Sequence, residues 1–235
     1  MGKGAKTGGS PYPIPHPPSP QAVGLLGGTF DPIHYGHLRL AEEMAELLGL
    51  AEVRILPAGL PPHRRQPRAA AHHRLEMARR AVTGNPRFVL DEREIQKASP
   101  SYSVETLKAL RKELPGGTPL ILFMGGDAFM GLTTWHRWEE LLDLAHLAVA
   151  HRPGFTSAVW EDALPEPLRR LLATRRCEQP GELSEKTAGL IHLHAITQLD
   201  ISASQIRERA LRGKSLRYLL PDSVIDYINE HHLYV

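Results

Sequence analysis

Apolar residues follow two alternating periods along the chain from Ala22 onward. Short apolar runs that end at glycine or proline are typical of buried strands, whereas apolar residues three or four apart are typical of helices. The runs predict strands over residues 22–26, 52–56, 88–90, 119–124, 146–150 and 190–193. The helical spacing predicts helices over residues 38–48, 72–82, 104–114, 135–144, 165–174, 201–211 and 223–231.

This alternation predicts an α/β fold: a Rossmann-like, doubly wound parallel sheet with helices on both faces and a helical segment at its C-terminal end. In such sheets, ligands bind beyond the carboxyl ends of the strands, where the order of the strands reverses. We therefore expect the chemistry of this chain to lie in loops that follow strands.

The stretch before the first predicted strand has a different composition. Residues 1–20 are rich in glycine, serine and proline, and such a segment cannot bury enough apolar surface to order itself. We expect a disordered tail over residues 1–21 and a single domain over residues 22–235.

Charge and cysteine content narrow the class of protein. Lys+Arg 28 against Asp+Glu 26 gives a net charge of +2, which gives no reason to expect a nucleic-acid binder. Cys177 is the single cysteine, so a reducing compartment is the simplest interpretation.

No apolar run reaches the roughly 18 residues of a membrane span, and no apolar segment follows Lys3 and Lys6 as a secretory signal requires. We expect a cytoplasmic protein that binds no membrane; the sequence does not indicate an oligomeric state.

A basic cluster stands out within this balanced chain. Its members are Arg64, Arg65, Arg68, Arg74, Arg79 and Arg80. We interpret most of it as a solvated helix face.

The first candidate site is the stretch GGTFDPIHYGHL, residues 27–38, which follows the first predicted strand. Gly27 and Gly28 have no side chains to block a ligand, so backbone N–H groups can approach a phosphate. His34 and His37 are three residues apart where a helix begins, and free N–H groups and the helix dipole favour anions there.

Three interpretations of these histidines compete: core packing, a zinc pair and a phosphate site. A zinc pair needs a third ligand, for which the candidates are Asp31, His63, His72, His192 and His194. Phosphate binding fits the glycines and the helix start together, so it is the interpretation that we favour.

The second candidate site is ISASQIR, residues 201–207. Ser202 and Gln205 have the S-x-x-Q spacing of a capping box, which predicts a helix start. Ser204 and Arg207 lie three residues apart near the same end, where a hydroxyl and a guanidinium suit polyphosphate oxygens. We assign the functional hydroxyl to Ser204, because Ser202 serves as the cap.

These two motifs, in this order, resemble the H-x-G-H and I-S-x-[ST]-x-x-R elements of the nucleotidyltransferase superfamily. Five further segments resemble the bacterial nicotinate mononucleotide adenylyltransferases: LPAGLPPHRRQP, LDEREIQKASPSYSVETL, GGDAF, TTWHRWEELL and HRPG. Pantetheine-phosphate adenylyltransferases are the alternative within the superfamily, but those chains are shorter and lack the tryptophan-bearing segment.

The resemblance implies transfer of the adenylyl group of ATP to nicotinate mononucleotide in NAD biosynthesis, with nicotinate adenine dinucleotide and pyrophosphate as products. It implies that His34, His37 and Arg207 are catalytic. The implied ATP-binding residues are Gly27, Gly28, Thr29, Phe30, Asp127, Ser204 and Arg207. The implied mononucleotide-binding residues are His63, Arg64, Ser103, Trp135, His136 and Arg152.

Within this implied site, Mg²⁺ would bridge the ATP phosphates and be held mainly by substrate oxygens and water. Asp127 would accept from ribose hydroxyls, whereas Asp31 is assigned to capping the turn. Trp135 would stack on the pyridine ring, and backbone N–H groups near Ser103, Trp135 and His136 would bind its carboxylate. We assign Trp138 to the core.

Two other classes of protein remain open. A metal-dependent hydrolase would use the 13 histidines as metal ligands. A nucleotide sensor without catalytic activity would keep the same fold.

Overall fold

The computed structural model describes residues 21–61, 66–97, 99–151, 161–197 and 199–235. In these residues, six parallel strands form one sheet in the order β3-β2-β1-β4-β5-β6. The strands are β1 (Val23–Gly28), β2 (Glu52–Pro57), β3 (Phe88–Leu90), β4 (Leu120–Gly125), β5 (His146–His151) and β6 (Ile191–Ala195). The predicted doubly wound sheet is confirmed, and its order reverses between β1 and β4.

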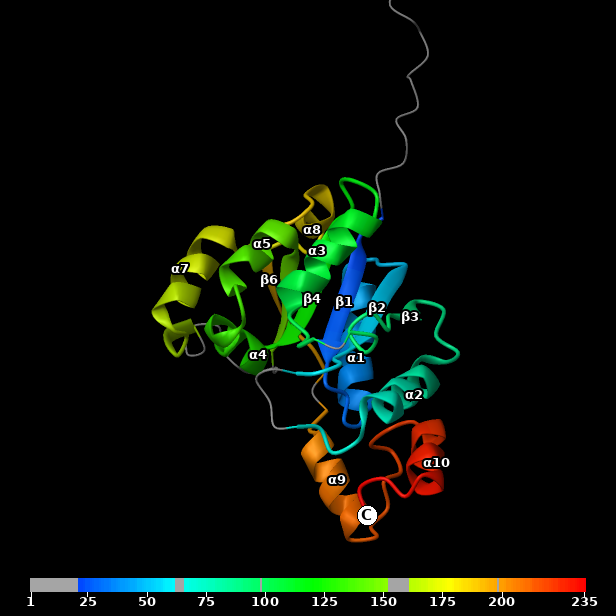
Figure 1. Cartoon of the computed structure of the whole chain (residues 1–235). Coiled ribbons are helices and arrows are strands. Elements are labelled where there is room, and N and C mark those ends of the chain that lie inside the picture. Colours follow the sequence, from blue (N-terminus) through cyan, green and yellow to red (C-terminus); the bar gives the residue numbers. More distant parts are fainter. Residues whose placement is uncertain (1–20, 62–65, 98, 152–160, 198) are drawn as a thin grey trace, which may run out of the picture.

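Helices cover both faces of this sheet, and two of them lie beyond the carboxyl ends of the strands (Figure 1). The two are α9 (Ala203–Leu211) and α10 (Asp222–Glu230). The other helices are α1 (Tyr35–Leu47), α2 (Ala71–Val82), α3 (Ser103–Glu113), α4 (Gly126–Met130), α5 (Leu141–Leu144), α7 (Glu166–Arg175) and α8 (Glu182–Glu185). Residues 1–20, the bulk of the predicted tail, lie outside the described residues.

Neighbouring residues of a strand point to opposite faces, which creates two hydrophobic cores. Leu26 of β1 packs with Met44 of α1 and Met77 of α2 on one face. Leu25 packs in the core that contains Leu107 of α3 on the other face. Burial on both faces explains why the strands are almost continuously apolar in sequence.

The predicted helix over residues 135–144 is wrong in its first half. The 3₁₀ turn η1 (Leu132–Thr134) ends at Trp135, and Arg137 has a left-handed φ of 53° that breaks the helix. Helical structure resumes in η2 (Trp138–Glu140) and continues into α5. Trp138, which we assigned to the core, is only partly buried at its margin.

The interpretation of the basic cluster is wrong for Arg74, whose side chain is 1% exposed. Its Nη1 donates to the carbonyls of Thr29 at 2.7 Å and Ala58 at 2.6 Å. Its Nη2 donates to Gly59 O at 2.8 Å, and its Nε donates to Ala69 O at 3.3 Å. One guanidinium therefore joins the loop after β1, the loop after β2 and the segment before α2.

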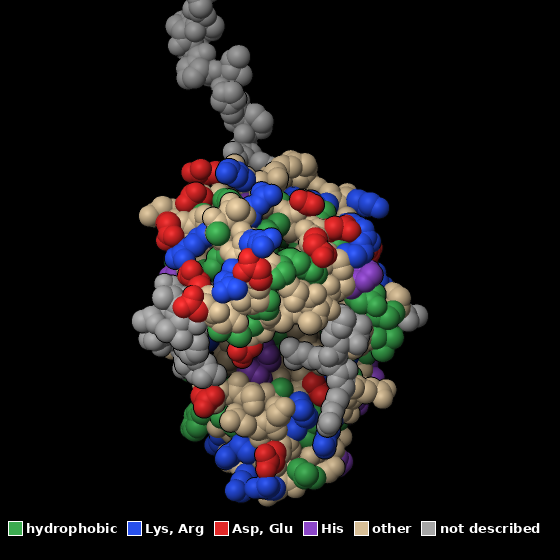
Figure 2. Space-filling model, turned by 90° about the vertical axis from the view of Figure 1, so that its left-hand side faces the viewer, with side chains coloured by type: hydrophobic (Ala, Val, Ile, Leu, Met, Phe, Trp, Pro, Cys, Tyr) green, Lys and Arg blue, Asp and Glu red, His purple; other side chains and the backbone are tan. Residues whose placement is uncertain are grey.

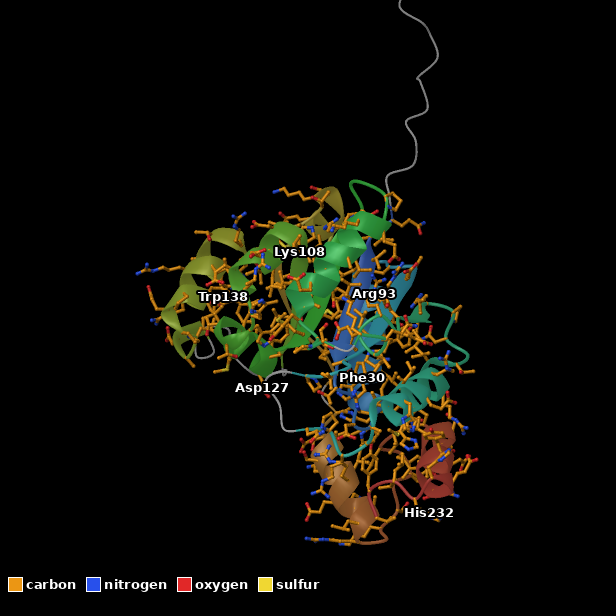
Figure 3. The ribbon with its side chains drawn as sticks, in the orientation of Figure 1. Phe30, Arg93, Lys108, Asp127, Trp138 and His232 are labelled. Atoms are coloured by element: carbon orange, nitrogen blue, oxygen red, sulfur yellow. The ribbon has the colours of Figure 1, made fainter. Side chains whose placement is uncertain are left out.

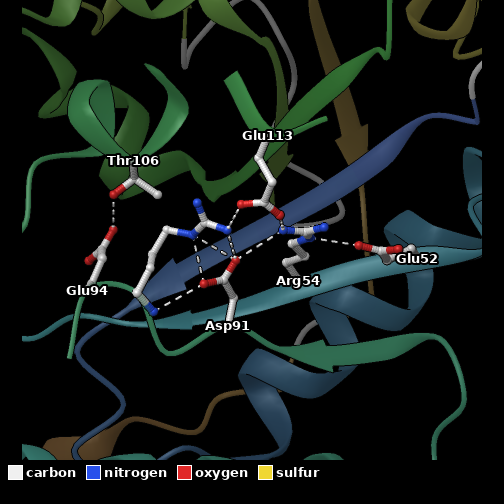
Figure 4. Close-up of polar contacts among 7 residues, drawn as sticks. Glu52, Arg54, Asp91, Glu94, Thr106 and Glu113 are labelled. Atoms are coloured by element: carbon white, nitrogen blue, oxygen red, sulfur yellow. Dashed lines mark hydrogen bonds and ion pairs between the residues drawn. The ribbon is translucent and has the colours of Figure 1, made fainter. Parts of the chain in front are cut away.

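A second charged network joins β2, the segment after β3 and the end of α3 (Figure 4). Arg54 Nε lies 2.7 Å from Glu52, and its Nη1 lies 2.8 Å from Glu113 and 3.4 Å from Asp91. Arg93 Nη2 lies 2.7 Å from Asp91 and 2.8 Å from Glu113. These bonds join the end of α3 to β2 and to the segment after β3.

The replacement Arg74→Met should lower the free energy of unfolding by about 3–5 kcal/mol, because it leaves buried carbonyls without donors. Urea titration followed by circular dichroism measures this change. The matched control is Arg79→Met on the same helix, where the side chain is 49% exposed and the cost should stay below about 1 kcal/mol. Equal losses in the two variants would contradict the role of Arg74.

Candidate active site

The carboxyl ends of β1 and β4 meet at one edge of the sheet, where the order of the strands reverses. The loop after β1 carries Phe30, and α4 after β4 carries Asp127; Figure 3 places both at this edge. Figure 2 shows a hollow on one face of the molecule with histidine side chains in it. The described residues therefore present a concave site where the fold class leads us to expect one.

The two glycines at the end of β1 are required for different reasons. A Cβ on Gly28 would lie 2.6 Å from the Phe30 ring, so packing alone excludes a side chain there. A Cβ on Gly27 would meet nothing within 4 Å, and the residue is exposed. Gly27 thus leaves open space beside the loop, as the approach of a phosphate to the backbone requires.

His34 and His37 stack on each other at the start of α1. Their ring centroids are 3.7 Å apart with an interplanar angle of 29°, and the edge of Phe30 packs on His37 at 5.0 Å. The N–H of His34 donates to Nδ1 of His37 at 3.3 Å. This contact favours the neutral tautomer of His37 whose proton is on Nε2.

His34 is the more buried of the two rings, at 5% exposure. Burial lowers its pKa to about 4, so it is neutral near pH 7. Its Nδ1 atom is buried without a hydrogen-bond partner in the described part of the chain. A Cβ on Gly36 would lie 3.0 Å from that nitrogen, which explains the glycine between the two histidines.

The second motif begins α9 as predicted, and its capping box is confirmed. Ser202 Oγ accepts from the N–H of Gln205 at 3.2 Å, and the side chain of Gln205 accepts from the N–H of Ser202 at 3.1 Å. Arg207 Nη2 donates to Ser204 Oγ at 3.1 Å, and its Nη1 donates to the carbonyl of Asp31 at 2.7 Å. The two motifs therefore meet, although 176 residues separate Asp31 from Arg207.

Asp31 supports the structure of the loop, but it caps a different segment from the one that we expected. Its carboxylate is 6% exposed and accepts from the backbone N–H groups of Arg68 at 2.8 Å and Ala69 at 3.1 Å, which precede α2. It also accepts from the hydroxyl of Tyr234 at 2.8 Å. Sequence reasoning missed Tyr234, because no local pattern links residues 203 positions apart.

Asp127 lies in the first turn of α4 and is exposed at the edge of the sheet. The preceding strand β4 is a parallel neighbour of β1, so Asp127 and the loop after β1 both lie at the carboxyl end of the sheet. Its position suits an acceptor for ribose hydroxyls beside bound phosphates.

A second group of predicted residues lies around the start of α3. Ser103 is the first residue of that helix, and the preceding Tyr102 packs its ring on His136 with centroids 4.3 Å apart. Arg137 pairs with Glu105 of α3 at 3.1 Å, which holds the two segments together. The structure thus brings the segments that carry Ser103 and His136 side by side.

Trp135 belongs to this group through its ring but not through its backbone N–H. The ring is partly buried against the core that contains Leu107. The N–H already donates to Leu132 O at 2.9 Å, and the binding of a ligand carboxylate by N–H groups near Trp135 stays a prediction. His63, Arg64 and Arg152, the other predicted mononucleotide residues, lie outside the described residues.

Two features of the described residues bear on the other classes of protein. In the described ranges, no group of three or more His, Cys, Asp or Glu side chains is arranged to hold a metal ion. Likewise, none of the helices in the described part is both long and apolar enough for a membrane span.

The fold and the paired motifs define a nucleotidyltransferase. The sequence model of the cytidylyltransferase-like family matches residues 25–209. A protein of Dechloromonas aromatica (strain RCB) is 51% identical over 91% of this chain and 98% of its own length, and one of Acidithiobacillus ferrooxidans is 49% identical over 89% and 94%. Both are named probable nicotinate-nucleotide adenylyltransferase.

Solved structures agree on the fold. The Plasmodium falciparum nicotinic acid mononucleotide adenylyltransferase, complexed with NaAD, matches with a TM-score of 0.68 and 17% identity, over 91% of this chain and 97% of that one. The chain therefore belongs to the cytidylyltransferase-like family, and within it to the nicotinate-nucleotide adenylyltransferases.

Because burial lowers the pKa of His34 from 6.5 to about 4, the unfolded chain binds more protons at this residue between those pH values. Stability should therefore rise with pH across this window, with a contribution of up to about 1.4 kcal/mol per pH unit. The variant His34→Asn should lack this contribution, so that its free energy of unfolding depends less steeply on pH.

Urea titrations at several pH values between about 4.5 and 7 measure how steeply the free energy of unfolding depends on pH. This range covers most of the interval between the two pKa values of His34. The control is His232→Asn, because His232 is exposed and lies apart from the site (Figure 3); its slope should match that of the unmodified protein. An unchanged slope in His34→Asn would show that His34 titrates as an exposed ring does.

Proposed function

We propose that this chain transfers the adenylyl group of ATP to nicotinate mononucleotide, with release of pyrophosphate and formation of nicotinate adenine dinucleotide in NAD biosynthesis. The observation that carries the proposal is the meeting of the two motifs, in which Arg207 donates to the carbonyl of Asp31 at 2.7 Å beside His34 and His37. The names of the relatives and the ligand of the Plasmodium protein support the choice of substrates.

The reaction is a displacement at the α-phosphorus of ATP. A phosphate oxygen of the mononucleotide forms the new bond to phosphorus while the bond to the bridging oxygen breaks, and pyrophosphate leaves. The phosphate is already an anion near pH 7, so it needs no general base. The protein contributes positioning and stabilisation of charge on the transferred group.

His34 and His37 supply hydrogen-bond donors for the α-phosphate. His34 stays neutral because of its burial, and its Nδ1 lies close to Gly36 in the first turn of α1, where N–H dipoles disfavour a proton. Nε2 of each ring therefore carries the proton that can be donated. Both rings lie at a helix start that itself attracts anions.

Arg207 and Ser204 bind the β- and γ-phosphates in this proposal. The guanidinium has five N–H groups, and its contacts with Asp31 and Ser204 leave others for phosphate oxygens. Anchoring on a backbone carbonyl also fixes the planar fork, which reduces the entropy lost when phosphate binds.

Mg²⁺ enters this proposal bound to ATP. The histidine rings, the Ser204 hydroxyl and the Arg207 guanidinium suit anions rather than a hard cation. The one carboxylate beside them in the described residues, that of Asp31, is buried and already accepts from Arg68, Ala69 and Tyr234. The ion would be held by phosphate oxygens and water, where it neutralises charge on the leaving pyrophosphate. The side chains described above still position the transferred group.

The acceptor nucleotide binds on the side of α3. The N–H of Ser103 lies in the first turn of that helix, where no intrahelical acceptor exists. With the N–H of His136 in the adjoining segment it forms a donor pair for a carboxylate, and the ring of Trp135 provides a stacking surface. Glu105, the nearest acidic residue to Ser103 in sequence, is paired with Arg137.

A site of N–H donors should prefer a carboxylate to an amide, because the NH₂ group of the amide would face a donor. We expect kcat/KM for nicotinate mononucleotide to exceed that for nicotinamide mononucleotide by at least about a hundredfold. The measurement is pyrophosphate release with ATP and Mg²⁺, with each acceptor in turn. Comparable values would contradict the donor pair, and absence of release with both acceptors would contradict the proposed function.

Removal of the Arg207 guanidinium should weaken the use of ATP. We expect Arg207→Ala to lower kcat/KM for ATP by the equivalent of about 1.5–3 kcal/mol, the range for a hydrogen bond to a charged group. Arg207→Lys should recover only part of this loss, because a point charge does not reproduce the fork.

The matched control is Arg209→Ala on the same helix, whose Nε donates to Ser215 O rather than to the site. It should keep kcat/KM close to that of the unmodified protein. If Arg207→Ala changed only the KM for the mononucleotide, the assignment of Arg207 to ATP would be wrong.

A further inference from the structure

Tyr234 lies after α10, yet its side chain reaches the loop after β1. The residue is 9% exposed and has a left-handed φ of 68°. Its hydroxyl donates to Oδ1 of Asp31 at 2.8 Å. Burial and the charge of Asp31 raise the pKa of Tyr234, so the phenol keeps its proton and stays a donor.

Asp31 connects this phenol to the phosphate-binding groups. Its carboxylate has two further donors, the N–H groups of Arg68 and Ala69. Its backbone carbonyl accepts from Arg207 Nη1 at 2.7 Å, and the same nitrogen lies 3.8 Å from Oδ2. Tyr234 and Arg207 therefore hold the two polar ends of one buried residue.

The carboxylate and the substrate compete for the same guanidinium. With three donors, the buried charge of Asp31 is largely satisfied, and Arg207 binds the backbone carbonyl. Loss of one donor would leave a less compensated carboxylate close to Arg207, and a buried anion attracts the nearest cation. The guanidinium would then turn toward the carboxylate and away from the polyphosphate.

We propose that Tyr234 is a positioning residue for adenylyl transfer, whose hydroxyl satisfies Asp31 so that Arg207 stays available to the phosphates of ATP. The inference rests on the proposed function, because its readout is that reaction. It adds a residue outside both motifs, from the segment that follows α10.

The test compares Tyr234→Phe with Tyr227→Phe, since both variants lose one phenolic hydroxyl and keep the ring. Tyr227 is 6% exposed and its hydroxyl contacts Nδ1 of His73 at 2.9 Å, away from the phosphate-binding residues. Tyr234→Phe should raise the KM for ATP and lower kcat, each by about tenfold, with the KM for the mononucleotide unchanged. Tyr227→Phe should keep all three constants within about twofold.

A double-mutant cycle separates positioning from general loss of stability. In the Arg207→Ala background, Tyr234→Phe should have little further effect on kcat/KM for ATP, because both changes act on the same contact. Multiplicative losses in the double variant would overturn the inference. So would constants for Tyr234→Phe that match those of Tyr227→Phe.

If circular dichroism shows that Tyr234→Phe is unfolded, the comparison is made in the Asp31→Asn background, where no buried charge is left to compete for Arg207. There the addition of Tyr234→Phe should change kcat/KM for ATP by less than about twofold, and a further loss of about tenfold would overturn the inference. Failure of the unmodified protein to release pyrophosphate would contradict the proposed function instead.

Discussion

The guanidinium of Arg74 is the interaction on which the carboxyl edge of the sheet depends. The loops after β1 and β2 turn carbonyl groups toward Arg74, and each buried carbonyl needs a donor. Arg74 provides donors to carbonyls in the loop after β1, in the loop after β2 and before α2. A lysine has no planar arrangement of donors with this reach. The loop after β1 also carries Asp31 and leads into α1. Arg74 therefore fixes the loop on which the proposed phosphate site is built.

Asp31 then joins this framework to α9. Its side chain fixes the segment before α2, and its carbonyl receives Arg207. In the proposed active site, one residue therefore does two things. The hydrogen bonds of Asp31 fix the loop after β1, and they also position Arg207. Gly36 is a second example, because a Cβ at this position would lie 3.0 Å from Nδ1 of His34. Substitutions at such positions change geometry and chemistry together.

Periodicity predicted all six strands and most helices, because burial on two faces leaves a strong pattern in this sheet. It failed at residues 135–137, where a left-handed Arg137 interrupts an otherwise helical pattern. It also failed at Arg74, since the helical period cannot distinguish a buried charge from a solvated one. The motifs predicted His34, His37, Ser204 and Arg207 as site residues; the fold brings the two motifs together, and the roles of the four residues stay predictions. Tyr234 escaped notice because only the fold brings it to Asp31, and the roles of His63, Arg64 and Arg152 stay predictions.

The contact between Tyr234 and Asp31 has a consequence for biosynthesis of the chain. The ribosome makes the H-x-G-H loop early and residues 201–234 last, yet the loop needs Arg207 and Tyr234 to complete its hydrogen bonds. The loop therefore acquires its full set of hydrogen bonds only after residues 201–234, which are made last, have docked on it.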